Sequence, residues 1–172
     1  GHDTAEGLTT AGFAALKRME AKGMAIDVSH LNDRCFDEVA SSTDAPLVAS
    51  HSNSRAVCGA PRNLTDAQFD CIRERGGLVG LNFCCGFLRE SGEPTFDDIS
   101  RHIDRWLERD GEDAIALGSD FDGCDTPRCI ASAANMPAFQ NLLRARFGET
   151  ITAKLCGLNA LRFFSRRIPA TL

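Results

Sequence analysis

The sequence has no excess of basic residues: its 172 residues carry a formal net charge of −5. A nucleic-acid-binding protein usually shows a basic patch or stripe, so this composition argues against nucleic acid as a partner. No apolar run approaches the roughly 20 residues that span a bilayer. The first residues also do not show the charged and apolar regions of a signal peptide. We therefore expect no membrane segment and a cytoplasmic location.

Two sequence signatures of cofactor sites are absent. Among the eight cysteines there is no C-x-x-C pair, the strongest signature of a zinc or redox site. Most of the cysteines lie in apolar periodic segments, where a free thiol behaves as a small hydrophobe. We expect structural thiols in a bacterial or otherwise reducing environment. A Gly-rich turn after the first apolar run is also missing, which argues against a nucleotide-phosphate site.

Apolar runs and amphipathic helical segments alternate along the chain without a long linker. The runs cover residues 24–30, 46–51, 78–83 and 114–119. The helical segments follow candidate caps at Thr9 or Thr10, Asn32, Thr65 and Thr95, with two further patterns near 137–147 and 150–164. This alternation predicts βα units and a parallel sheet within a single α/β domain, residues 1–172. Four strands are half of the eight that a (β/α)₈ barrel requires.

Two histidines lie at the carboxyl ends of successive apolar runs, His30 and His51. Because the carboxyl ends of parallel strands meet at one rim, we expect both imidazoles to point into one cavity. Neutral imidazole suits zinc, but catalytic zinc usually takes three protein ligands, so two histidines form an incomplete site. His102 falls in the middle of a helical segment, where a solvent-facing or packing role is expected. His2 lies near the terminus.

Charged residues follow the second and fourth runs. Asp120 and Asp122 would share a face of an extended segment, although the Asp-Gly step at Asp122 is also a strong turn signal. Asp120, nearer the strand, is the better candidate for proton transfer or metal-site support. Arg62 follows the second run, and its guanidinium could hold a carboxylate bidentately or be an ordinary surface group. Asn53 and Arg55 are close enough in sequence to line the same rim.

Segments in order from Gly7 to about Phe164 resemble motifs of the renal (membrane) dipeptidase family of zinc metallopeptidases. They are Gly7-Leu8-Thr9, Gly23 to His30 (GMAIDVSH), Ser50 to Asn53 (SHSN), Pro61 to Asp66 (PRNLTD), Gly76 to Phe83 (GGLVGLNF), Gly118 to Gly123 (GSDFDG) and Gly157 to Arg162 (GLNALR).

The resemblance implies the carboxyl-terminal half of a TIM-like (β/α)₈ barrel, about four βα units plus terminal helices. It implies a two-zinc centre at the carboxyl rim, in which His30 and His51 would bind one zinc. Arg62 would hold the carboxylate of a dipeptide substrate. Asp120 would act in catalysis, handling a proton while a metal-activated hydroxide attacks the dipeptide carbonyl.

Part of the family's site has no counterpart in this chain. The family's first zinc uses a His-x-Asp pair near the amino terminus, and a Glu further along bridges the two metals. We therefore expect this chain to supply half of a binuclear site, with at most one zinc well liganded. A half-barrel also leaves strand edges and an apolar face uncovered. This predicts a partner, either the complementary amino-terminal half or a second copy.

Two other functions stay open from the residues alone. The chain could be a catalytically incomplete fragment that acts only as a barrel half or as a single-metal binding module. It could also be a single-metal amidohydrolase in which Asp120 joins His30 and His51 as a direct ligand.

Overall fold

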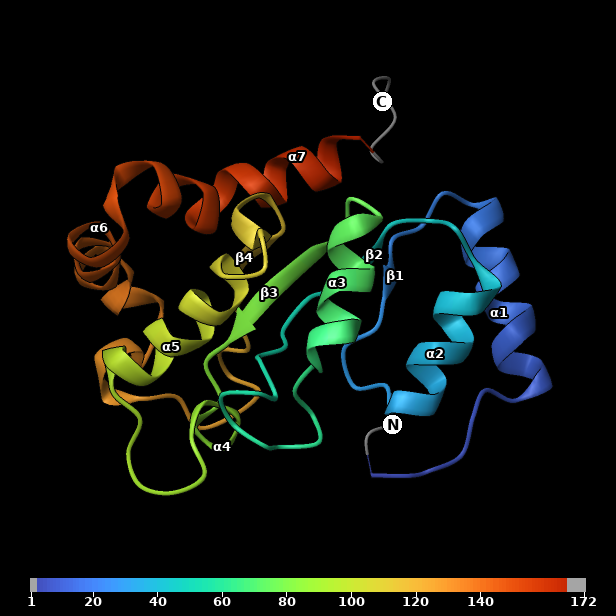
Figure 1. The fold of residues 1–172 in the computed structure, drawn as a ribbon, viewed down its shortest axis with the longest axis horizontal. Helices are drawn as coiled ribbons and strands as arrows, with labels where there is room; N and C mark the ends of the chain where they lie inside the picture. The colour runs from blue at the N-terminus through green and yellow to red at the C-terminus, as the bar shows by residue number, and fades with distance from the viewer. Residues whose placement is uncertain (1–2, 167–172) are drawn as a thin grey trace.

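Four short parallel strands form the centre of the fold, seen in a computed structural model that describes residues 3–166 (Figure 1). His2 lies outside the described residues. The strands are β1 (Ile26–Asp27), β2 (Leu47–Ala49), β3 (Leu78–Asn82) and β4 (Ile115–Ser119). The helices are α1 (Thr10–Ala21), α2 (Asp33–Ser42), α3 (Asp66–Glu74), α4 (Cys85–Leu88), α5 (Phe96–Leu107), α6 (Met136–Ala153) and α7 (Asn159–Ser165). Short 3-10 turns occupy Gly111–Asp113, Arg128–Ile130 and Ala133–Asn135, and a π-helical turn covers Lys154–Leu158.

The strands lie in the order β1-β2-β3-β4, and each pairs in parallel with the next. Helices make the connections, α2 between β1 and β2, α3 between β2 and β3, and α5 between β3 and β4. The prediction of consecutive βα units with a parallel sheet is therefore confirmed. All four predicted strands are present, although β1 is reduced to two residues.

Local hydrogen bonds explain where the helices begin. The Thr9 and Asn32 side chains accept hydrogen bonds from backbone N–H groups in the first turns of α1 and α2. Thr65 and Thr95 both stand in capping boxes, as their sequences predict. In α6, Gly148 takes a φ of +78° and interrupts the helix. This interruption corresponds to the boundary between the two helical patterns predicted in the tail.

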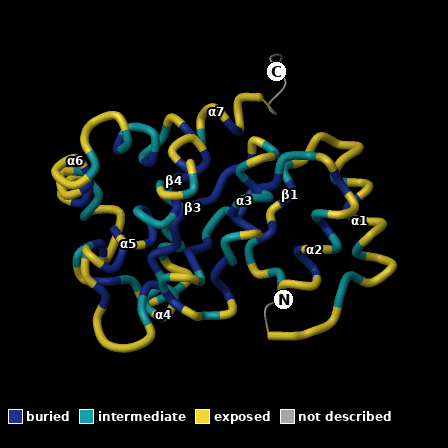
Figure 2. The backbone as a smooth tube through the Cα atoms, viewed as in Figure 1, coloured by how far each residue is buried: buried dark blue, intermediate teal, exposed yellow. Residues whose placement is uncertain are grey.

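The main core lies between the sheet and the helices α2, α3 and α5. The Phe69 and Trp106 rings stack there with centroids 4.0 Å apart, and both side chains are fully buried. In Figure 2 the buried part of the backbone is concentrated along the strands and the inner sides of these helices. The apolar periodicity of the sequence predicts this layer.

A smaller apolar cluster lies on the other face of the sheet. Phe163 of α7 packs against Val48, Leu78 and Ala116, whose side chains alternate with those that face the main core. Asn159 anchors α7 by donating to the backbone oxygen of Ile115, at the start of β4. In Figure 1, α7 runs along the end of the sheet opposite to the β3 arrowhead.

All eight cysteines are free thiols in the structure. Cys35 and Cys58 are buried, and the other six are half-buried. None of the helices within residues 3–166 combines the length and apolar character needed to cross a bilayer.

Candidate metal and substrate site at the carboxyl rim

The two histidines predicted as metal ligands meet at the rim. His30 follows β1 and His51 follows β2, and their Nε2 atoms are 2.9 Å apart. The Ser50 hydroxyl lies 2.7 Å from Nδ1 of His51 and orients that ring. Burial, and after it the charge of Arg62, lowers the pKa of His51. The neutral imidazole, which is the form that binds metals, is therefore favoured at this position.

Left-handed backbone conformations collect at the same rim. His30, Ser119, Asp120 and Asp122 have φ values of 70°, 49°, 68° and 65°. Such conformations are uncommon outside glycine, and they cluster at functional sites. The prediction that Asp120 and Asp122 share a face of an extended segment is therefore wrong. A turn forms instead, with the N–H of Gly123 donating to the carbonyl of Asp120, because the Asp-Gly step favours it.

Asp120 keeps its place beside the histidines. Its Oδ2 accepts a hydrogen bond of 3.0 Å from Nδ2 of Asn82, the last residue of β3. The same Nδ2 of Asn82 also donates to the carbonyl oxygen of His51 at 3.4 Å. Asp120 acts electrostatically on His51 and on Arg62. The Asp120 carboxylate is therefore close enough to His51 and to Arg62 to interact with both through its charge.

Arg62 is a buried rim residue, only 5% exposed, and so it is not an ordinary surface group. Nη1 donates to the hydroxyl of Ser52 at 2.9 Å, and Nη2 donates to the carbonyl of His51 at 3.0 Å. Its Nε is buried and has no hydrogen-bond partner. The ring of Phe87 lies 5.9 Å from the guanidinium carbon. Burial lowers the pKa of Arg62, although a guanidinium stays charged at neutral pH.

Asparagines hold the loops of the rim together, and sequence reasoning missed most of this role. Asn53 donates to the carbonyl of Asn82 and accepts from its N–H, both at 2.9 Å. Asn63 donates to the carbonyl of Phe87 at 2.9 Å. Arg55 forms a bidentate ion pair with Asp33, the first residue of α2. Asn53 thus connects the loop after β2 to β3, and Arg55 connects the same loop to the start of α2.

His102 is a packing residue, one of the two roles predicted for it. Its side chain is fully buried in α5. Nδ1 accepts from the N–H of Ser54 at 3.1 Å, and Nε2 donates to the carbonyl of Leu88 at 3.0 Å. Burial lowers its pKa to about 4. His102 therefore connects α5 to the loop that follows β2 and to the end of α4.

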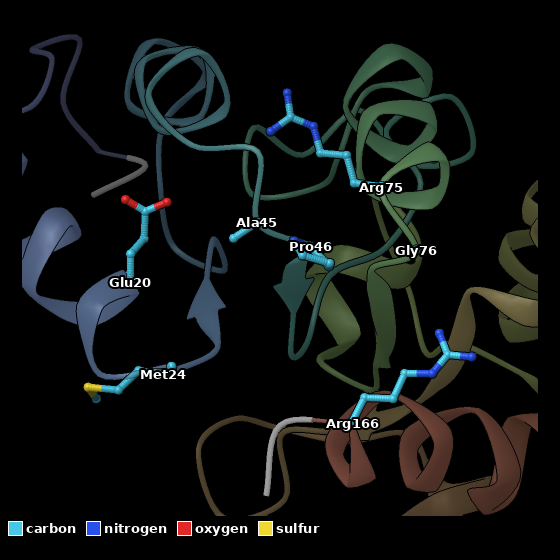
Figure 3. Close-up of a pocket in the computed structure, with 8 residues that line it drawn as sticks. Glu20, Met24, Ala45, Pro46, Arg75, Gly76 and Arg166 are labelled. Carbon is cyan, nitrogen blue, oxygen red and sulfur yellow. The ribbon is translucent and has the colours of Figure 1, made fainter. Parts of the chain in front are cut away.

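A cavity of about 520 Å³ lies at the opposite end of the sheet (Figure 3). Met24, Pro46 and Gly76, which precede the three strands β1, β2 and β3, line it. Glu20 faces it from one side, with Arg75 and Arg166 on the other. Enzymes with parallel βα units keep their chemistry at the carboxyl ends of the strands. We therefore assign the functional site to the rim and not to this cavity.

The number of possible metal ligands at the rim is limited within residues 3–166. No third His, Cys, Asp or Glu joins His30 and His51 in a group that could hold a metal ion. The described structure therefore does not support the reading in which Asp120 completes a single-metal site. The fold and the rim together define an α/β protein of parallel βα units, with paired imidazoles, a buried arginine and a carboxylate at the carboxyl ends of its strands.

Comparison with known proteins specifies the family. The family model described as membrane dipeptidase (peptidase family M19) matches residues 1–168. The chain therefore belongs to the membrane dipeptidase family, and the fold is half of its TIM-like barrel.

Individual relatives show how much of their length this chain covers. An uncharacterized protein in the pqqA 5′ region of Klebsiella pneumoniae is 46% identical over 165 residues, which are 93% of this chain and 61% of that protein. Dipeptidase 3 of Rattus norvegicus is 29% identical, over 92% of this chain and 33% of that protein. A metallopeptidase from Rhodobacter sphaeroides, crystallised with a phosphinate mimic of the dipeptide L-Ala-D-Ala, superposes with a TM-score of 0.91 at 44% identity. That superposition covers 98% of this chain and 49% of the other. The chain thus spans about half the length of the solved relative.

Proposed function

We propose that this chain supplies half of a dipeptidase site, in which His30 and His51 bind one zinc ion. The observation that carries the proposal is the 2.9 Å approach of the two Nε2 atoms at the carboxyl rim. Tetrahedral zinc with Zn–N bonds of 2.0–2.1 Å separates two imidazole nitrogens by about 3.3 Å. A shift of a few tenths of an ångström therefore suffices for the pair to share one metal. When bound, zinc would act as a Lewis acid toward the substrate carbonyl and its attacking water.

The proposal requires the remaining ligands to come from outside the described residues. Catalytic zinc usually takes three protein ligands, and residues 3–166 contain no group of three. The same observation supports a second candidate function, a single-metal binding module without hydrolytic activity. The two candidates differ in whether a partner completes the site.

Arg62 and Asp120 are proposed to act on the substrate itself. Two hydrogen bonds hold the Arg62 side chain in place, and its buried Nε has no protein partner. Such a group suits the carboxylate of a dipeptide, because a guanidinium binds carboxylates in a planar fork. Asp120, fixed by Asn82, would carry the proton toward the leaving amine.

A partner is proposed for the open sides of the sheet. The order β1-β2-β3-β4 leaves the outer edges of β1 and β4 without strand partners among the described residues. Leu158, Leu161 and Phe164 next to this sheet are 56%, 67% and 42% exposed. Exposed edges and apolar patches mark association surfaces. The partner is either a complementary amino-terminal barrel half or a second copy.

Zinc titration tests the ligand assignment. We expect the wild-type chain to bind at most one zinc per chain, with the imidazole resonances of His30 and His51 shifting together. His51→Ala should abolish this binding, because one nitrogen ligand remains. His102→Asn is the matched control, since both nitrogens of that buried imidazole already bond to backbone groups, at Ser54 and Leu88, and it should leave zinc binding unchanged. Zinc content that is equal in wild type and His51→Ala would refute the assignment.

Complementation decides between the two functions. The chain is mixed with the amino-terminal half of the Rhodobacter sphaeroides relative, and hydrolysis of L-Ala-D-Ala is followed. The dipeptidase proposal predicts activity of the mixture that neither half shows alone. The hypothesis of a single-metal binding module predicts no hydrolysis by the mixture, even when native mass spectrometry shows a 1:1 complex of the two halves with zinc.

Arg62→Lys tests the carboxylate role in the active mixture. Lysine keeps the charge but loses the planar fork. We expect kcat/KM for a dipeptide to fall at least tenfold, while kcat/KM for the same dipeptide with an amidated carboxyl terminus changes little. An equal loss for both substrates would show that Arg62 acts on the rim structure and not on the substrate carboxylate.

A further inference from the structure

Two side chains from the end of β1 hold the end of β2. Oδ1 of Asp27 accepts from the N–H of Ser29 at 2.9 Å and from the N–H of Ser50 at 3.1 Å. The hydroxyl of Ser29 accepts from the N–H of His51 at 3.1 Å. The two consecutive backbone N–H groups that follow β2 are thus bound by side chains at and just after the end of β1, and the second of these N–H groups belongs to His51 itself.

These bonds continue the strand pairing where the backbone ladder stops. The β1–β2 ladder has two residue pairs, and the N–H of Val28 donates to the carbonyl of Val48. The carbonyl of Val28 then accepts from the N–H of Leu31, so the chain turns away from β2. Beyond this point the Asp27 carboxylate takes the place of a strand carbonyl as the acceptor for Ser50.

The same carboxylate shapes the turn that carries the other histidine. A bond from an Asp side chain to the N–H two residues on forms an Asx turn. The next residue, His30, has a φ of 70°, a conformation that costs free energy unless surrounding contacts hold it. One oxygen atom therefore fixes both the turn before His30 and the strand end before His51.

We infer that Asp27 and Ser29 are positioning residues for the His30–His51 pair. The metal-binding part of this inference rests on the proposed function. The role that we assign to Asp27 runs through backbone hydrogen bonds, since its Oδ1 accepts from the N–H groups of both Ser29 and Ser50. Residues that orient metal ligands typically change metal affinity 10- to 100-fold when they are mutated. Asp27 also acts on His51 through its charge, so the test must separate hydrogen bonding from charge.

Two substitutions of Asp27 make this separation. Asp27→Asn keeps an oxygen at the acceptor position and removes the charge, while Asp27→Glu keeps the charge and moves the oxygen by one methylene. We expect Asp27→Asn to bind zinc within about threefold of wild type, and Asp27→Glu and Asp27→Ala to bind at least about tenfold more weakly. Wild-type affinity in Asp27→Ala, or rescue by Glu instead of Asn, would overturn the inference.

A measurement without metal keeps the inference separate from the proposed function. In the wild-type chain we expect a nuclear Overhauser effect between the His30 and His51 rings and slow hydrogen exchange at the Ser50 and His51 amides. Asp27→Ala should lose the ring contact and the Ser50 protection, and Ser29→Ala should lose the His51 protection. The Val28 amide should stay protected in both variants.

Asp33→Ala is the control, because Asp33 is an exposed carboxylate that pairs with Arg55 and Gln68 instead. It should preserve the ring contact and the zinc affinity. Unchanged exchange at Ser50 and His51 in the Asp27 and Ser29 variants would overturn the inference, even if zinc does not bind to any of them. Failure of zinc binding in the wild-type chain with an intact ring contact would instead contradict the proposed function alone.

Discussion

Lowering the pH from 7 to 4 should cost the wild-type chain about 3 kcal/mol of unfolding free energy through His102 alone. The pKa of this buried imidazole falls from 6.5 to about 4 in the folded protein. Between these values the unfolded chain binds a proton that the folded chain excludes. Stability from His102 is therefore complete above pH 6.5 and is lost as the pH falls toward 4.

The hydrogen bonds of His102 explain why the proton is excluded. Nδ1 accepts from the N–H of Ser54, so a proton on Nδ1 would face another donor in a buried site. His102→Asn removes the titration and offers an acceptor to Ser54. Urea unfolding of both chains between pH 7 and 4 should show the steeper loss in the wild type. Equal pH dependence would contradict this role, because His51 and the carboxylates are common to both chains.

Gly80→Ala should destabilise the fold by about 3 kcal/mol or more and disturb the histidine pair. A Cβ at Gly80 would lie 2.0 Å from the carbonyl oxygen of Ser50 and 2.9 Å from the Cα of Gly118. Both are backbone atoms, so no side-chain rotation relieves the contact. The end of β2 must move, and Ser50 directly precedes His51.

Gly86→Ala is the matched control for Gly80→Ala, because an added Cβ there meets no atom within 4 Å. Its free energy of unfolding should stay within about 0.5 kcal/mol of wild type. Chemical denaturation and zinc titration measure both effects. A Gly80→Ala chain with wild-type stability and zinc affinity would show that the strand end at Ser50 can shift without cost.

Most of the secondary structure was predictable, because local rules govern it. Capping residues such as Thr65 mark helix starts through contacts three residues away. The four apolar runs became the four parallel strands. Gly80 in β3 and Gly118 in β4 also indicate a close approach of the backbones, because glycine within a strand often marks such a contact. By contrast, the brevity of β1 and the helix α4 had no clear local signature.

The sequence predicts where the site residues lie along the fold, but it does not predict their conformations and contacts. Strand alternation predicts His30 and His51 at one rim, where they lie. It does not predict the left-handed turn at Asp120 or the burial of Arg62. It also does not show that Asp27 bonds to Ser50, because that contact depends on the register of two strands.

The sequence by itself determined the order of the elements, the parallel βα organisation, the rim placement of the histidines and the family resemblance. These follow from side-chain period, capping and motif, all of which operate over a few neighbouring residues. Only the tertiary structure decided which groups meet: the two Nε2 atoms, from residues 21 positions apart, and the His102–Ser54 bond, which spans 48 positions. Such contacts depend on strand register and on the packing of helices against the sheet, and no local pattern encodes these distances.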